Sequence, residues 1–199
     1  GVGEPAESYV PPGTGGYLPP RGGEENLAKA RRYLEEAGYP GGEGLPELEL
    51  IVFSGEETER VAAVVQQLWK RRLGVRIAIN NMERTLYFSR RRERDFDLCF
   101  LGWVGDYVDP TTFLGLWHSE AGNNLAGWSD PEYDRLLERA ATAEDRNRTL
   151  AEAEARLLHD LPVIPLYFGS TRYVIDPRVK GWHANLLDQH PLRAVRFEP

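Results

Sequence analysis

The sequence predicts an α/β fold, because a strand, a long helix and a second strand follow one another with short connections. Apolar and polar residues alternate over residues 48–52, as they do in a half-buried strand. Residues 56–73 then place their apolar side chains on one helical face, and Gly74 follows as a stop signal. Alternation resumes over residues 75–79. Such a unit pairs its strands in parallel through a right-handed crossover.

The remaining elements have local signals of their own. Helical spacing of apolar residues predicts a helix over 27–37 that ends at Gly38. Asp130 with Pro131 predicts a helix start, either with Asp130 as cap or with Ser129 and Glu132 as a capping box. The other predicted helices cover 85–92, 110–117 and 144–159, and the other predicted strands cover 96–101, which we expect to be central, 163–168, 173–175 and 194–197.

Length and composition favour one compact domain. The chain has 199 residues, 41% of them hydrophobic, which is enough for one compact domain. Residues 1–23 are rich in proline and glycine, and we interpret them as a lead-in segment cut from a longer protein. Residues 24–199 are then a single α/β domain. No signal peptide is visible in this fragment.

Charge and sulfur content exclude several classes of function. The net charge of −7 argues against nucleic acid as a partner, and we interpret the arginines of residues 90–94 as a solvated helix end. Cys99 is the single cysteine, so no internal disulfide forms. Gly55 alone does not make a phosphate loop, and the four histidines lack metal-ligand spacing. We therefore expect no cofactor and no metal.

The most informative segment is residues 96–110. The apolar run 96–101 is typical of a strand covered on both faces, and such sheets bind ligands beyond the carboxyl ends of their strands. Asp106 follows that end, between glycines and aromatic residues. Asp109 precedes Pro110 and is explained as a helix cap. Asp106 has two interpretations of similar weight: an Asx-type turn residue or a ligand-binding carboxylate.

Two further observations concern this segment. The indole of Trp103, beside a carboxylate, would suit a cationic group or an extended organic ligand. Asp106 with Asp109 or Glu120 could also form the acid pair of a glycosidase, although the capping role of Asp109 argues against it.

Taken together, several short segments resemble the C-terminal lobe of family 5 extracellular solute-binding proteins, the oligopeptide and dipeptide receptors of ABC importers. The segments that carry the resemblance are 28–40 (AKARRYLEEAGYP), 67–70 (QLWK), 73–75 (LGV), 95–97 (DFD), 102–107 (GWVGDY), 131–134 (PEYD) and 162–167 (PVIPLY). Their order and spacing cover nearly the whole chain.

The resemblance implies one lobe of a periplasmic-binding-protein type II-like fold, with a mixed sheet flanked by helices. It implies that Asp106 pairs with the free α-amino group of a peptide, with Trp103 and Tyr107 in the same pocket. The implied partners are the peptide, an ABC-transporter permease and the missing N-terminal lobe of the same protein. The implied location is extracytoplasmic, either periplasmic or as a membrane-anchored lipoprotein.

Other functions compete with this one. An oligosaccharide or another solute could replace the peptide in a receptor of the same family. A glycosidase and a sensor or interaction module belong to other classes. The lead hypothesis is a non-enzymatic receptor that closes over its ligand.

Overall fold

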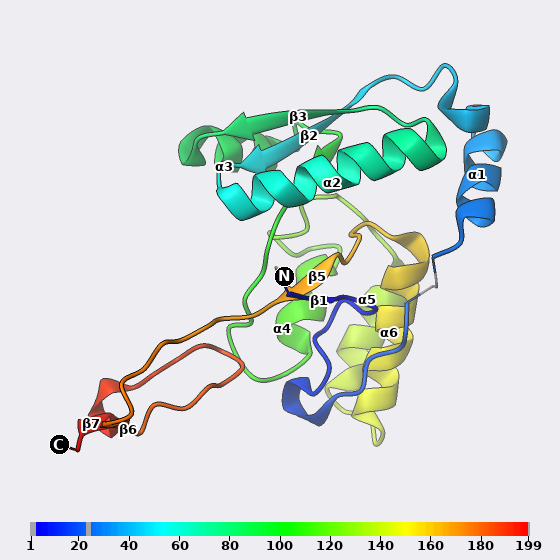
Figure 1. Ribbon diagram of the computed structural model, residues 1–199. Coiled ribbons are helices and arrows are strands. Elements are labelled where there is room, and N and C mark those ends of the chain that lie inside the picture. Colours follow the sequence, from blue (N-terminus) through cyan, green and yellow to red (C-terminus); the bar gives the residue numbers. More distant parts are fainter. Residues whose placement is uncertain (1–2, 23–24, 199) are drawn as a thin grey trace. The chain divides into compact units, whose positions relative to one another are not determined.

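The computed structural model describes residues 3–22 and 25–198, and their contacts divide them into two compact units (Figure 1). The first, which we name the sheet unit, contains residues 25–102. The second, the helical unit, contains residues 3–22 and 103–198. The sequence predicts one domain over 24–199, whereas the contacts between residues divide this range into two units, with the boundary after Gly102. The assignment of both units to one lobe stays a prediction.

The sheet unit is built on three parallel strands in the order β3–β2–β4. Strand β2 (Leu48–Phe53) pairs in register with β3 (Ile77–Met82), and α2 (Glu56–Leu73) connects them, as predicted. Helix α1 (Leu27–Glu36) and the 3-10 turn η2 (Pro40–Gly42) precede β2, and α3 (Arg84–Glu93) follows β3. Antiparallel pairing also occurs, but in separate two-stranded sheets of the helical unit.

The end of α2 shows how the sequence determines a local turn. Gly74 has φ 72°, in the left-handed region, and its N–H donates to the carbonyl of Lys70. A Cβ at Gly74 would lie 2.0 Å from the carbonyl oxygen of Gly41, so only glycine fits this close approach.

Both faces of the parallel sheet are covered by apolar side chains. Leu50 and Val52 pack with Ala62 of α2 on one face, and Ile51 packs with Tyr87 of α3 on the other. The strand β4 (Leu98–Cys99) and Phe100 follow the same alternation, with Leu98 and Phe100 on the first face and Cys99 on the second; Phe96, which precedes the strand, also packs on the second face. The run is therefore half-buried with apolar contacts on both faces, which is less cover than the sequence predicts.

The predicted position and length of this strand are wrong. β4 pairs only with β2, so it lies at the edge of the described sheet while β2 is central. Regular pairing covers Leu98 and Cys99, and the last bond to the ladder joins the N–H of Phe100 to the carbonyl of Ile51. Cys99 is half-buried, and this burial raises the pKa of its thiol.

The sequence predicts that the arginines of residues 90–94 form a solvated helix end, and this prediction is wrong for Arg90. Its guanidinium donates to both carboxylate oxygens of Glu49 at 2.9 and 2.7 Å, and to Asp95 at 2.7 Å. The bonds from Arg90, followed by one from Asn80, lower the pKa of Glu49, and those from Arg90 tie the end of α3 to β2. Arg90 is therefore a structural residue of the sheet unit.

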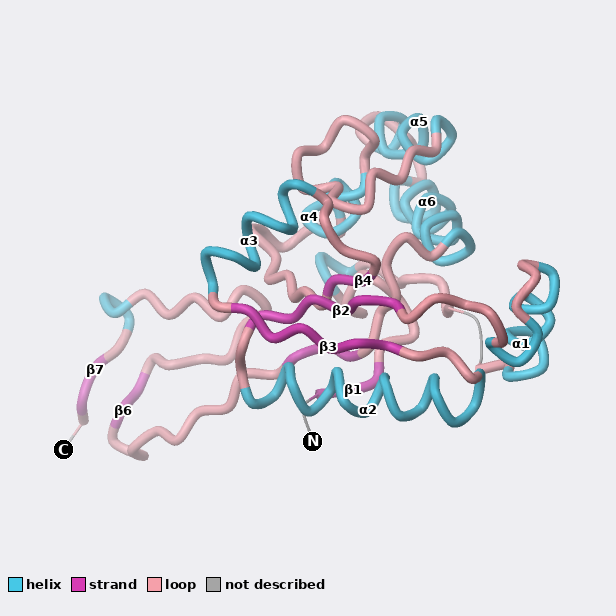
Figure 2. Tube along the Cα trace, turned by 90° about the horizontal axis from the view of Figure 1, so that it is seen from above, coloured by secondary structure: helices cyan, strands magenta, loops and turns pink. Residues whose placement is uncertain are grey.

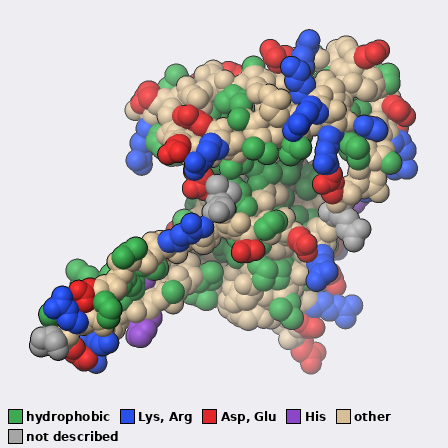
Figure 3. All heavy atoms as spheres, viewed as in Figure 1, with side chains coloured by type: hydrophobic (Ala, Val, Ile, Leu, Met, Phe, Trp, Pro, Cys, Tyr) green, Lys and Arg blue, Asp and Glu red, His purple; other side chains and the backbone are tan. Residues whose placement is uncertain are grey.

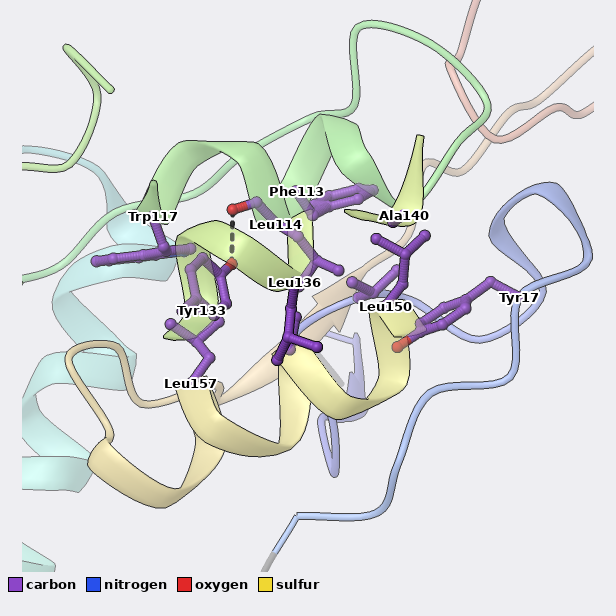
Figure 4. Packing of buried hydrophobic residues seen from close by; sticks show 11 residues of the cluster. Tyr17, Phe113, Leu114, Trp117, Tyr133, Leu136, Ala140, Leu150 and Leu157 are labelled. Carbon is purple, nitrogen blue, oxygen red and sulfur yellow. Dashed lines mark hydrogen bonds between the residues drawn. The ribbon is translucent and has the colours of Figure 1, made fainter. Parts of the chain in front are cut away.

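The helical unit is organised around α5 (Pro131–Ala140) and α6 (Arg146–Asp160), which pack together. Leu136, Leu150 and Leu157 meet between them, and the hydroxyl of Tyr133 donates to the carbonyl of Leu114 at 2.7 Å (Figure 4). Leu114 lies in α4 (Thr111–Leu114), which continues into the 3-10 turn η3 (Gly115–Trp117).

The start of α5 distinguishes between the two predicted caps. The carboxylate of Asp130 accepts hydrogen bonds from the backbone N–H groups of Glu132 and Tyr133, so Asp130 is the cap and Pro131 the first helical residue. The hydroxyl of Ser129 is instead bonded to that of Ser119.

The lead-in segment is an integral part of the helical unit. β1 (Gly3–Pro5) pairs antiparallel with β5 (Tyr167–Gly169), and the 3-10 turn η1 (Thr14–Gly16) follows. Val10 and Tyr17 are fully buried in the core of the unit. The strand predicted over 163–168 is observed as β5, which begins at Tyr167, because proline at position 165 cannot donate a hydrogen bond to a ladder.

The C-terminal residues contain little regular structure (Figure 2). β6 (Val179–Lys180) pairs antiparallel with β7 (Arg196–Phe197), which confirms the second half of the strand predicted over 194–197. The 3-10 turn η4 (Leu192–Ala194) precedes β7. The strand predicted over 173–175 is wrong, because these residues form no ladder. Tyr173 instead packs edge-on against Trp182.

Charged side chains of both signs are interspersed on the face shown in Figure 3. Within residues 3–22 and 25–198, no helix combines the length and the apolarity that crossing a membrane requires.

Glu154 fastens the lead-in segment to α6. Its side chain is fully buried, and its carboxylate accepts hydrogen bonds from the N–H groups of Tyr9 (2.7 Å) and Val10 (2.9 Å) and from the hydroxyl of Tyr17 (2.7 Å). Burial raises the pKa of this carboxyl, and the three donors offset only part of that effect.

We predict that the free energy of unfolding contributed by Glu154 falls as pH rises. A raised native pKa means that the folded state holds the proton more tightly than the unfolded state, so stability is lost above the unfolded pKa. Glu154→Gln removes the titration, and the wild-type free energy minus the variant's should decrease between pH 4 and 7. The limiting slope is about 1.4 kcal/mol per pH unit. Urea denaturation at each pH checks this, and a difference that increases with pH would contradict it.

Candidate ligand-binding loop

The predicted site residues lie on one loop of the helical unit, residues 103–110, which we name the acidic loop. The loop begins at Trp103, whose half-buried ring packs against the core cluster of the unit. The Nε1 atom of Trp103 is buried and has no hydrogen-bond partner among residues 3–22 and 25–198. Trp103 therefore anchors the start of the loop, a role that its position in the sequence did not indicate.

Asp106 is held by its backbone rather than by its side chain. Its N–H donates to the hydroxyl oxygen of Thr112 at 2.8 Å. Its side chain is exposed, and its carboxylate makes no hydrogen bond or ion pair with the part of the chain that the structure describes. The Asx-type turn, one of the two interpretations left open by the sequence, requires a bond from the side chain to the loop, and the structure lacks it.

Asp109 has the opposite arrangement, because one oxygen of its carboxylate is engaged by three donors. Its Oδ1 atom accepts bonds from the N–H of Thr111 (2.9 Å), the hydroxyl of Thr111 (2.6 Å) and the guanidinium of Arg146 (2.8 Å). Burial alone would raise the pKa of Asp109, but these bonds outweigh it and hold the pKa below its usual value. The predicted capping contact is confirmed, although regular helix begins at Thr111.

The side chains around Asp106 present apolar surface to solvent. Val104 is 68% exposed, Tyr107 49% and Val108 53%. The hydroxyl of Tyr107 lies 3.4 Å from that of Thr111. An unpaired carboxylate beside exposed aliphatic and aromatic groups suits an organic ligand that carries a positive charge.

Other parts of the described chain are weaker candidates for a ligand or metal site. A shallow open depression on α6 is lined by Ala155, Arg156, His159 and Asp160, and it does not include the acidic loop. Across the described residues, no group of three or more His, Cys, Asp or Glu side chains is arranged to hold a metal ion. The engagement of Asp109 with Arg146 leaves it unsuited to the acid pair of a glycosidase.

Sequence reasoning missed Thr112 and Arg146. The spacing of Asp109 and Thr111 is a recognisable turn signal that places Thr112 nearby. Arg146 lies 37 residues beyond Asp109 in the chain, and no local pattern connects the two.

The α/β fold of the chain matches that of solved periplasmic solute-binding proteins. A family model described as bacterial extracellular solute-binding proteins, family 5 middle, matches residues 1–124. The chain belongs to this family of solute-binding proteins.

Individual relatives support the assignment. The oligopeptide-binding protein OppA of Bacillus subtilis is 32% identical over 188 residues, which cover 89% of this chain and 34% of OppA. The periplasmic murein peptide-binding protein MppA of Escherichia coli is 33% identical over 195 residues, which cover 93% of this chain and 36% of MppA. The chain thus spans about a third of the length of these relatives.

Solved structures share the fold of this chain. The Escherichia coli MppA structure matches with a TM-score of 0.88 and 30% identity, covering 98% of this chain and 40% of that one. The structure of Haemophilus influenzae OppA, solved in complex with the peptide RPPGFSPFR, matches with a TM-score of 0.82 and 27% identity, covering 99% and 41%. These relatives are binding proteins.

We predict that Gly105→Ala destabilises the acidic loop, whereas Gly102→Ala does not. A Cβ at Gly105 would lie 3.0 Å from Cγ2 of Thr112 and 3.3 Å from the ring of Phe113, both in α4. A Cβ at Gly102 meets nothing within 4 Å. Gly105→Ala should lower the free energy of unfolding by about 1–3 kcal/mol, as overpacking does. Gly102→Ala should change it by less than about 0.5 kcal/mol. Chemical denaturation of the two variants checks this, and equal effects would show that Gly105 is not packed as described.

Proposed function

We propose that this chain is part of the substrate-binding component of an ABC importer, and that Asp106 pairs with the free α-amino group of a peptide ligand. The observation that carries the proposal is the exposed Asp106 carboxylate, which has no partner among the described residues while its backbone is fixed. The names of the OppA and MppA relatives, and the peptide bound to Haemophilus influenzae OppA, support peptide as the ligand class.

The chemistry of the loop suits a peptide N-terminus. An ammonium group donates charge-assisted hydrogen bonds to a carboxylate, and these are about twice as strong as neutral ones. Two aromatic residues lie near Asp106 in the sequence, Trp103 before it and Tyr107 after it. The exposed ring of Tyr107 and the accessible part of the Trp103 indole offer apolar surface for the first residues of the ligand. Because the loop recognises the ligand terminus, side chains further along the ligand are free to vary.

The proposed mechanism is binding followed by closure, without bond chemistry and without a cofactor. The N-terminal lobe of the same protein would complete the pocket, and exclusion of water by closure would strengthen the ion pair. The loaded receptor would pass the peptide to an ABC-transporter permease. The proposed location is extracytoplasmic, periplasmic or as a membrane-anchored lipoprotein.

Substitution of Asp106 tests the proposal. In the complete receptor, Asp106→Asn keeps the shape of the side chain and removes its charge. The preference for free over N-acetylated peptides should fall at least tenfold, because truncating one partner of a desolvated charge pair costs about 2–5 kcal/mol. The preference can be measured by equilibrium dialysis against a tetrapeptide library and its N-acetylated copy, with mass spectrometry as the readout.

Glu120→Gln is a control of the same charge change outside the acidic loop, and it should keep the wild-type preference. Equal weakening of free and acetylated peptides by Asp106→Asn would contradict the assigned role of Asp106.

We also predict that the 199-residue chain by itself binds peptides weakly, because half of the proposed pocket belongs to the other lobe. Isothermal titration with peptides that the complete receptor binds should give dissociation constants above the micromolar range. Micromolar binding by the chain alone would show that the acidic loop does not need the second lobe.

A further inference from the structure

We propose that Thr112 is a positioning residue for Asp106, and that Arg146 braces the same loop through Asp109. This inference rests on the proposed function, since it assigns to two residues outside the ligand pocket a part in recognising the peptide terminus. Neither residue needs to touch the ligand. Both act on the backbone that carries the Asp106 carboxylate.

The first contact is the bond from the Asp106 N–H to the Thr112 hydroxyl oxygen, at 2.8 Å. Thr112 is 4% exposed, so this hydroxyl is a buried acceptor shielded from competing water. It belongs to α4, whose residues Phe113 and Leu114 are buried in the core of the helical unit. The backbone of Asp106 is thereby tied to a packed helix rather than to another loop.

The second contact fixes the far end of the acidic loop. Asp109 binds Arg146, the first residue of α6, through the 2.8 Å bond described above. The same oxygen accepts the N–H of Thr111 at the start of α4. The loop is therefore attached to two helices that pack in one core, by α4 through Thr112 and Thr111 and by α6 through Arg146.

The two acids of the loop have different roles. The carboxylate of Asp109 holds the loop, whereas Asp106 is held by its N–H, so both carboxylate oxygens of Asp106 stay free. A binding group that is fixed before the ligand arrives loses less conformational entropy on binding. Thr112 and Arg146 supply this preorganisation for the free α-amino group, and for no other part of the ligand.

The test measures selectivity rather than affinity alone. In the complete receptor, Thr112→Val keeps the shape of the side chain and removes the acceptor, and Thr112→Ser keeps the acceptor. Thr112→Val should lower the ratio of free to N-acetylated tetrapeptide binding by about tenfold, the effect of one lost buried hydrogen bond. Binding of the acetylated library should change by less than about twofold. Thr112→Ser should restore most of the ratio.

Arg146→Met should lower the same ratio by a smaller factor, about threefold, and Arg146→Lys should recover part of it, because Lys keeps the charge but not the planar geometry of the guanidinium. Thermal unfolding of every variant shows whether it is folded at the temperature of the binding experiment.

A double mutant distinguishes a role of Thr112 in positioning Asp106 from a general contribution of Thr112 to the stability of the loop. If Thr112 acts through Asp106, then Thr112→Val in an Asp106→Asn background has nothing left to position, and the double mutant should show the ratio of Asp106→Asn alone. Additive losses would overturn the inference, as would equal weakening of free and acetylated peptides by Thr112→Val. If Asp106→Asn itself leaves the ratio unchanged, the proposed function fails, and the inference fails with it. If only Asp106→Asn changes the ratio, the proposed function stands and the inference alone is overturned.

Discussion

The hydrogen bond between the Asp106 N–H and the Thr112 hydroxyl determines what the acidic loop can do. A loop that presents a charged side chain must be held by something other than that side chain, or the charge is neutralised by its own support. Here the support comes from a backbone donor and from a second acid, Asp109, that is engaged with Arg146. The result is an ordered loop that leaves one carboxylate without a partner among the described residues.

A carboxylate also holds a segment of backbone in place in the core of the helical unit. There the buried side chain of Glu154 binds N–H groups that no strand of the described residues pairs with. Glu154 gathers two backbone N–H groups and one hydroxyl from a segment more than 130 residues away in the chain. The energetic requirement is strict, because a buried acid that lost these donors would be left unsatisfied. The proline-rich segment is held both by its bonds to Glu154 of α6 and by its short pairing with β5.

Local signals in the sequence predicted the local structure well. The bounds of α2, the turn at Gly74 and the helix start at Asp130 and Pro131 all depend on residues within one or two turns of each other. The family and its fold class also followed from short segments and their order. What failed depended on distant partners: the edge position of β4, the ion pairs of Arg90, and the contact of Arg146 with Asp109 are set by packing that no spacing rule contains. For the candidate site, the sequence identified the loop and its acid but not the residues that hold them.

The half-buried thiol of Cys99 has a practical consequence. Thiolate is the reactive form, and a raised pKa leaves little of it at neutral pH, so alkylating reagents meet a poor nucleophile in the folded protein. A cysteine introduced on the solvent side of the acidic loop, for example in place of Val108, would react much faster than the native one. The chain can therefore accept a single fluorophore beside Asp106 without removal of its own cysteine.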